Sequence, residues 1–356
     1  MDEWSRHCES LRQLFQENVY GMWPGSPEVV TSTRVSMQAD VGADVSLIEL
    51  ELTESLGRLR PLHLLLAAPS QAAGPRPCLL GLNFSGNRSV LVGESAHGRV
   101  PWPVSEVLAR GYLLASIHAS EIVADNPARA EEDLARMRRE AGSPRQRTDT
   151  ATIMAWAFGL SCAISALRRE DCVAGDRIAV FGHSRLGKAA LLSAAMDTRI
   201  AAVISSQSGC GGAAPWRVPP HLREPGLDGR PTVETLDSII GEFPHWFAHA
   251  LSEYVGRTDR LPVEQSDLMA LCAPRPLLLT NAADDIWAFP AGQYRALLAA
   301  QDAYRRLDPE LPHLPVEMPT GDETVGGRLG WFIRQGGHSV CWLDWETWLS
   351  FADQWL

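Results

Sequence analysis

The sequence is poor in the features that mark membrane proteins and nucleic-acid-binding proteins. No stretch approaches the roughly 18 consecutive apolar residues that a membrane-spanning helix requires. Basic residues are the minority, because 32 Lys and Arg residues stand against 43 Asp and Glu residues and leave a net charge of −11. Nucleic-acid binding requires a basic surface, which this balance does not supply. We therefore expect neither a membrane nor a nucleic acid as a partner.

Cysteine is also scarce. Seven cysteines are scattered over the chain, at positions 8, 78, 162, 172, 210, 272 and 341, without the spacing of a metal-binding motif. The N-terminus shows no basic segment followed by an apolar one, as a secretory signal would. An odd number of cysteines without such a signal indicates reduced thiols and a cytoplasmic protein, with a secreted mature form as the alternative. We expect no metal and no other cofactor.

The sequence does contain a regular alternation of short apolar runs and longer helical stretches. Its composition, 45% apolar and 21% charged, is ordinary for a globular protein. Strands are predicted at 78–84, 112–117, 177–181, 201–205 and 276–280, and helices at 104–110, 149–168, 186–195 and 291–303. Strands that alternate with helices predict an α/β fold with a mostly parallel central sheet and helices on both faces.

The two ends of the chain extend this pattern. We expect a helix at 4–16, strands within 29–68 and a final helix at about 344–356. Two stretches, 119–148 and 211–232, are charged or rich in Pro and Gly and are typical of loops or lids; the second lid-like insertion is taken to reach about residue 250. No linker is evident, so we expect a single domain over 1–356, with an N-terminal part up to about 75 and a catalytic core from about 76.

A candidate nucleophile lies where a predicted strand passes directly into a helix. The segment is Gly182-His-Ser184-Arg-Leu186-Gly187. A serine on such a turn, flanked by small residues, is typical of the nucleophile elbow of α/β-hydrolases. The usual Gly-x-Ser-x-Gly pattern has its second glycine at the position that Leu186 occupies here. The alternative interpretation is that Ser184 merely caps the following helix.

Candidates for the other two members of a catalytic triad follow in the order acid, then histidine, that this fold uses. Asp284 and Asp285 come directly after the predicted strand at 276–280, where a carboxylate can orient a histidine. His338 follows two glycines and precedes the final helix, so its loop can fold over the sheet. A serine hydroxyl needs a base of near-neutral pKa, and a carboxylate fixes the tautomer of that base.

Several motifs resemble the glucuronoyl esterases of carbohydrate esterase family 15, especially the bacterial ones. The resemblance covers roughly residues 15–356, and Ser-Arg-x-Gly-Lys from Ser184 is its most specific element. The other matching segments are 81–87, 156–161, 204–214, 234–235, 243–247, 285–288 and 336–338. The resemblance implies an α/β-hydrolase fold and an esterase that works without a cofactor.

The resemblance also implies roles for individual residues. Ser184 would be the nucleophile and His338 its base, with Arg185 helping to hold the oxyanion. Substrate binding is expected from Lys188, which would contact sugar hydroxyls, from Glu234 and Trp246 along a uronate pocket, and from Gln207.

The acid of the triad differs between branches of the family. Many fungal members place it where this chain has Gln207, whose amide carries no charge. Bacterial relatives often use an acid after the later strand. That position matches Asp285 here, with its neighbour Asp284 as the alternative.

These observations predict a serine carboxylic-ester hydrolase that forms an acyl-enzyme on a polar or uronate-type ester, either a small molecule or an oligosaccharide. One alternative is an acyltransferase or cyclase on the same fold, because the acceptor pocket rather than the triad decides between water and another acceptor. A second is a catalytically silent binding protein, which the glutamine at 207 would favour. The oligomeric state is not predicted.

Overall fold

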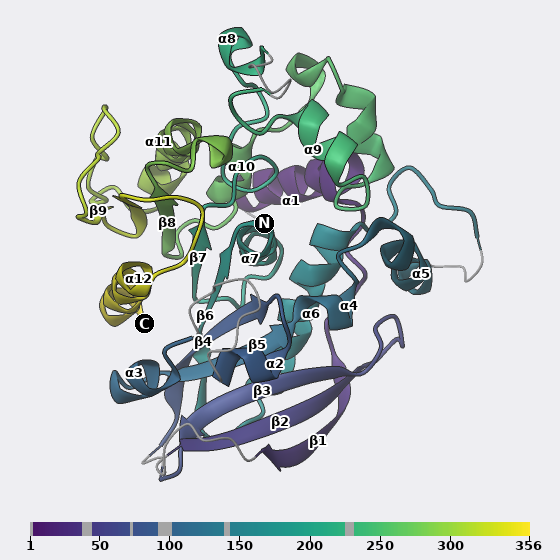
Figure 1. Ribbon diagram of the computed structural model, residues 1–356, viewed down its shortest axis with the longest axis vertical. Helices are drawn as coiled ribbons and strands as arrows, with labels where there is room; N and C mark the ends of the chain where they lie inside the picture. Colours follow the sequence, from purple (N-terminus) through teal and green to yellow (C-terminus); the bar gives the residue numbers. More distant parts are fainter. Residues whose placement is uncertain (1–2, 38–44, 72–73, 92–101, 139–142, 225–230) are drawn as a thin grey trace.

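The computed structural model describes residues 3–37, 45–71, 74–91, 102–138, 143–224 and 231–356 (Figure 1). Ten strands form one sheet in the order β1-β2-β3-β5-β4-β6-β7-β8-β10-β9. Their bounds are β1 Val29–Met37, β2 Val45–Glu54, β3 Leu62–Pro69, β4 Arg76–Asn83, β5 Leu113–His118, β6 Val173–His183, β7 Ala202–Ser206, β8 Leu277–Ala282, β9 Val325–Gly326 and β10 Leu329–Arg334.

The centre of the sheet is parallel and its two edges are antiparallel. The pairs from β5 through β4, β6, β7 and β8 to β10 are parallel. At one edge, β1, β2, β3 and β5 pair antiparallel, and at the other edge β9 pairs antiparallel with β10. The parallel strands are almost continuously buried, as expected for strands covered on both faces. The predicted α/β fold with a mostly parallel sheet is confirmed, and the N-terminal strands belong to the same sheet as the core.

Helices cover both faces of the sheet (Figure 1). Their bounds are α1 Glu3–Phe15, α2 Asn87–Leu91, α3 Val104–Ala109, α4 Ala119–Ile122, α5 Pro127–Met137, α6 Thr152–Leu167, α7 Arg185–Met196, α8 Pro220–Arg223, α9 Leu236–Glu242, α10 Gln265–Ala270, α11 Pro290–Leu307 and α12 Trp342–Trp355. The larger core packs α1, α6, α7, α10 and α11 against one face. The smaller core packs α2, α3 and α12 against the other.

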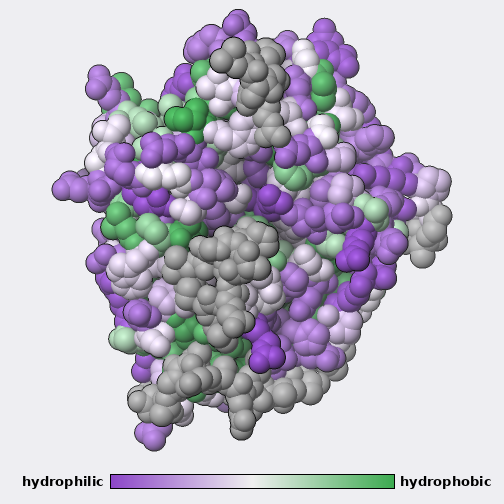
Figure 2. Space-filling view, viewed as in Figure 1, coloured by the Kyte–Doolittle hydropathy of each residue, from purple (hydrophilic) through white to green (hydrophobic). Residues whose placement is uncertain are grey.

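Helix α6 lies at the centre of the larger core. Its sequence is apolar on all sides, and nearly every residue of it is buried, which is the pattern of a fully enclosed helix. Figure 2 shows that the molecular surface in this view is mainly hydrophilic, with hydrophobic side chains in small separate groups. No helix of the described residues is both long enough and apolar enough to span a bilayer.

Two segments expected to be loops contain helices. Within 119–148, the structure has α4 and α5; Asn126 caps α5 through its side chain, and Pro127 occupies the first turn, where the missing N–H costs nothing. Within 211–250, α8, α9 and a 3₁₀ helix at His249–Tyr254 occur. Residues 139–142 and 225–230 of these segments lie outside the described part. The expectation of loops was wrong where α5 and α8 lie, and the capping signal of α5 was overlooked. Helix α9 follows the stretch 211–232.

Strand β10 was also not predicted. It pairs in parallel with β8 and is completely buried. Because the carboxyl ends of parallel strands meet at one edge, β10 delivers the loop after Arg334 to the same edge as the ends of β6, β7 and β8. This edge of the sheet carries the candidate active site.

Candidate active site

Ser184 occupies a sharp turn between β6 and α7. Its backbone has φ 59° and ψ −131°, a conformation that residues with a side chain rarely adopt. A Cβ added to Gly182 would lie 2.2 Å from the carbonyl oxygen of Leu186, and one on Gly187 would lie 2.9 Å from the carbonyl oxygen of Gly182. Both glycines are therefore required by the turn. The second glycine of the elbow is at 187. Leu186, in the first turn of α7, is buried.

The side chain of Ser184 faces His338 and makes no capping hydrogen bond to α7. His338 Nε2 lies 2.9 Å from Ser184 Oγ, and His338 Nδ1 lies 2.6 Å from Asp285 Oδ2. The Asp285 side chain is 5% exposed, whereas Asp284 is exposed. The hydrogen bond that joins Asp284 to the histidine loop is from its backbone N–H to Gly336 O. Of the two aspartates considered, the structure brings Asp285 to the imidazole.

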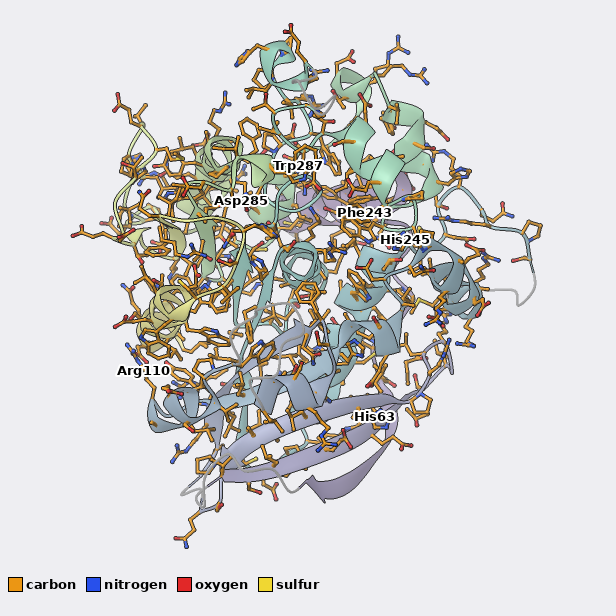
Figure 3. The ribbon with its side chains drawn as sticks, in the orientation of Figure 1. His63, Arg110, Phe243, His245, Asp285 and Trp287 are labelled. Carbon is orange, nitrogen blue, oxygen red and sulfur yellow. The ribbon has the colours of Figure 1, made fainter. Side chains whose placement is uncertain are left out.

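Three strand ends assemble this chain of hydrogen bonds. Ser184 follows β6, Asp285 follows β8 and His338 follows β10. The backbone of Ala283 donates to the carbonyl oxygen of Arg334, so the acid and histidine loops are tied together at their bases. Figure 3 shows Asp285 beside Trp287 on the loop after β8. Residues 154 positions apart along the chain thus meet within hydrogen-bonding distance.

The Arg185 side chain is held by an anchor that the sequence did not reveal. One guanidinium nitrogen donates to Asp125 Oδ2 at 2.5 Å, and the guanidinium carbon lies 4.7 Å from the Trp246 ring centre and 5.2 Å from that of Phe243. These two rings stack in parallel at 3.7 Å. Arg185 Nε is buried and, among the described residues, has no hydrogen-bond acceptor. The Arg185 side chain as a whole is 30% exposed, so other atoms of it are open to a substrate next to Ser184.

Asp125 lies at the centre of this anchor. Its Oδ1 accepts from Trp246 Nε1 at 2.8 Å and lies 3.2 Å from His245 Nε2. Burial alone raises the pKa of Asp125, but the hydrogen bonds from His245, Trp246 and Arg185 outweigh it and lower the pKa to about 2. Asp125 is therefore ionised and balances the charge of Arg185. Trp246, expected along a uronate pocket, is 2% exposed and serves this anchor.

Lys188 is not a solvated helix lysine, and its expected contact with sugar hydroxyls stays a prediction. It is 3% exposed, and Nζ donates to the carbonyl oxygens of Ser208 at 2.7 Å and Cys210 at 2.6 Å. Its third contact, at 3.2 Å, is Glu234 Oε2, which also accepts the backbone N–H of Cys210. The three ammonium protons thus have protein acceptors, and Lys188 and Glu234 brace the segment after β7.

Gln207, also expected to bind substrate, is buried and has partners within the protein. It is 1% exposed, and both polar atoms of its amide bond the backbone of Ser339. It therefore contacts the residue after His338.

A cavity of about 400 Å³ opens above Ser184. Ser184, Arg185 and His338 form part of its wall, together with Asn83 at the end of β4. Aromatic side chains line another part of the wall, namely Trp102, Phe181, Trp345 and Trp348. The described residues that line the cavity do not include Lys188, Gln207, Glu234 or Trp246. No group of three or more His, Cys, Asp or Glu side chains in the described part of the chain is arranged to hold a metal ion.

The chain is similar in sequence to known esterases. Residues 144–308 match the family model described as "Glucuronyl esterase, fungi". A curated relative, carbohydrate esterase MZ0003 from an unknown prokaryotic organism, is 32% identical over 384 residues, covering 99% of this chain and 85% of that protein. The 4-O-methyl-glucuronoyl methylesterase of Hypocrea jecorina is 36% identical over 158 residues, which is 43% of this chain but only 32% of that protein.

A solved structure agrees with these sequence matches. The glucuronoyl esterase from Solibacter usitatus superposes with a TM-score of 0.85 at 27% identity, covering 99% of this chain and 93% of that one. The similarity thus spans the whole chain in both sequence and fold. It confirms the resemblance noted from the motifs: the chain belongs to the glucuronoyl esterases of carbohydrate esterase family 15 and is a carboxylic-ester hydrolase.

Proposed function

We propose that this enzyme hydrolyses esters of uronic acids through an acyl-enzyme on Ser184, with His338 as general base and Asp285 as the acid that orients it. The observation that carries the proposal is the unbroken chain Ser184 Oγ, His338 Nε2, His338 Nδ1, Asp285 Oδ2, with contacts of 2.9 and 2.6 Å. A carboxylate at Nδ1 keeps the proton there, so that Nε2 is free to accept the serine proton.

The reaction then follows from the positions of these groups. Ser184 Oγ attacks the ester carbonyl while its proton passes to His338 Nε2, and a tetrahedral oxyanion forms. His338 next protonates the leaving alcohol, which departs and leaves Ser184 acylated. A water molecule repeats the attack with His338 as base, releasing the uronic acid and restoring the serine hydroxyl.

The oxyanion would be held by Arg185. Its backbone N–H lies at the start of α7, where the first amides lack helical acceptors and the helix dipole is positive. Its guanidinium group lines the cavity beside Ser184 and is anchored by Asp125. One preorganised donor of this kind contributes about 3–4 kcal/mol to transition-state stabilisation.

The substrate class rests on the relatives and on the chemistry of the cavity wall. The Hypocrea jecorina relative is named a 4-O-methyl-glucuronoyl methylesterase, and the Solibacter usitatus structure is a glucuronoyl esterase. Arg185 and Asn83 supply polar groups to the cavity wall, which suits a polar acyl group. We infer that the acyl part is a uronate, free or within an oligosaccharide.

The direct test is hydrolysis of methyl 4-O-methyl-glucuronate, followed as acid release. We expect turnover by the native enzyme and none above background by Ser184→Ala. Ser193→Ala is the matched control, because Ser193 is a buried serine of α7 whose hydroxyl donates to the carbonyl oxygen of Ala190. Native enzyme that folds but releases no acid from this ester would overturn the substrate class. Products formed with an added alcohol would show whether transfer competes with hydrolysis.

A further inference from the structure

Gln207 is held in an unusual backbone conformation at the end of β7. Its φ is 46°, in the left-handed region, which costs a residue with a side chain about 1–2 kcal/mol. Its backbone N–H donates to Thr280 O of β8 at 2.8 Å, and its side chain is almost fully buried. Strained conformations of this kind persist only where the surrounding structure enforces them, and they cluster at functional sites.

The carboxamide of Gln207 pairs with the backbone of Ser339, the residue after His338. Gln207 Nε2 donates to Ser339 O at 2.7 Å, and Gln207 Oε1 accepts from Ser339 N at 3.2 Å. The amide thus bonds Ser339 as a neighbouring strand would. Only a side chain with both a donor and an acceptor can do this, whereas an ionised carboxylate of the same shape has acceptors alone.

The loop that carries His338 needs such support because its residues are exposed. Residues 337–339 are exposed, and the His338 side chain is 44% exposed. The second support is Arg334, whose Nη2 donates to Ser339 O at 2.6 Å and whose Nε bonds the fully buried Asp344 at 2.8 Å. Both supports act on Ser339 and leave the imidazole itself open to the cavity.

The end of β7 also fixes the serine. The carbonyl oxygen of Ser206 accepts the backbone N–H of Ser184 at 2.8 Å. Two consecutive residues, Ser206 and Gln207, therefore contact Ser184 on one side and Ser339 on the other. This strand end sets the separation between the serine and the histidine, whose reacting atoms lie 2.9 Å apart.

We infer that Gln207 is a positioning residue of this esterase: its carboxamide fixes the backbone next to His338 so that Nε2 stays within reach of Ser184 Oγ. The inference rests on the proposed roles of Ser184 and His338. The expectation that Gln207 binds substrate stays a separate prediction. A purely structural role would lower stability without changing the turnover of the folded enzyme.

The test compares Gln207→Leu, which removes both hydrogen bonds, with the native enzyme. Misplacing a catalytic group by about 1 Å costs up to roughly 100-fold, so we expect kcat to fall about 10- to 100-fold with little change in KM. The rate of labelling by a fluorophosphonate, which needs the serine–histidine pair but no sugar, should fall in parallel. Gln265→Leu is the matched control, because Gln265 is fully buried and bonds Tyr20 and Gly212 in the core.

Gln207→Glu gives a signature that a structural role would not. When ionised, the introduced carboxylate cannot donate to Ser339 O, but when protonated it can make both bonds. We expect the ratio of its kcat to that of the native enzyme to rise as the pH falls from about 8 to about 5, while the melting temperatures show that both remain folded. A ratio that is flat with pH, or a Gln207→Leu variant with native kcat, would overturn the inference.

Hydrogen exchange separates failure of this inference from failure of the proposed function. In Gln207→Leu the amide of Ser339 loses its acceptor and should exchange faster, whereas amides of β7 should not change. Slow exchange at Ser339 in the native enzyme and fast exchange in the variant would support the positioning role of Gln207, even if the uronate ester were not a substrate. Unchanged exchange at Ser339 would refute it, whatever the activity.

Discussion

Asp125 holds Arg185 by a hydrogen bond of 2.5 Å that spans 60 positions of sequence. The aspartate comes from the segment between α4 and α5, and the arginine begins α7. Trp246 and His245 bond the other carboxylate oxygen, so the guanidinium is fixed from several directions. An oxyanion donor is effective when it is preorganised, because it then needs no rearrangement as charge develops.

Asp125→Asn should therefore slow ester hydrolysis. The amide keeps the shape but loses the charge that balances Arg185, so we expect kcat to fall about tenfold, less than the 100- to 1000-fold expected for removing an oxyanion donor outright. Steady-state kinetics on the methyl ester measures it. The control is Asp197→Asn, which disrupts a comparable pair with Arg199 at the far end of α7. An unchanged kcat for Asp125→Asn would mean that Arg185 needs no anchor.

The low pKa of Asp125 also predicts a pH effect on stability. The folded value of about 2 lies below the unfolded value of roughly 3.9, so folding favours the ionised form. This contribution is complete above about pH 5 and is lost as the pH falls towards 2. The difference in melting temperature between native enzyme and Asp125→Asn should shrink over that range. A constant difference would contradict the assignment.

The two neighbouring aspartates should differ sharply on substitution. Asp285→Asn removes the charge at His338 Nδ1 and favours the wrong tautomer, so kcat should fall by about 10⁴-fold. Asp284→Asn, an exposed position, should change kcat by less than about twofold. Kinetics of the pair measures the contrast directly. Equal losses at both positions would show that the loop, and not one carboxylate, matters.

Lys188→Met tests whether the lysine is a brace or a sugar contact. Removing one partner of a buried ion pair costs about 3–5 kcal/mol, because Glu234 is left buried without its counter-charge. We expect a large loss in the free energy of unfolding, measured with urea, and a comparatively small rise in KM. A large rise in KM with native stability would instead place Lys188 on the substrate.

Gly182, the first glycine of the elbow, should not tolerate a side chain. Gly182→Ala would place a methyl group 2.2 Å from the backbone oxygen of Leu186, so we expect a loss of about 1–3 kcal/mol in stability together with loss of activity. Gly241→Ala is the control, because nothing lies within 4 Å of its added Cβ in α9. That change should stabilise the enzyme by about 0.5–1 kcal/mol. Denaturant unfolding distinguishes the two.

Sequence patterns predicted the parts of the fold that depend on local hydrophobic runs. The central strands and helices α6, α7 and α11 are each marked by a continuous run or a clear period, and they lie where expected. Strand β10 was missed, because its run Leu329–Arg334 mixes glycine, aromatic and charged residues and ends at an arginine that only a buried partner, Asp344, makes acceptable.

Some residues of the candidate site could likewise be identified from the sequence and others could not. Ser184, Asp285 and His338 were found because their order and their glycine settings carry a signal along the chain. Asp125 and His245 were missed because their link to Arg185 is made only in three dimensions. Lys188 and Gln207 were identified as important positions, and the partners that the structure shows for them within the protein were not predicted. A sequence does not show whether a polar side chain is satisfied by the protein or left for a ligand.

The backbone angle of Ser184 has a consequence for engineering. A residue with a side chain is disfavoured at φ 59°, ψ −131° by about 1–3 kcal/mol, and glycine is not. Ser184→Gly should thus yield an inactive protein that melts at a higher temperature than the native enzyme. Selection for thermal stability alone would then favour replacement of Ser184. Engineering for stability must therefore measure turnover at every step.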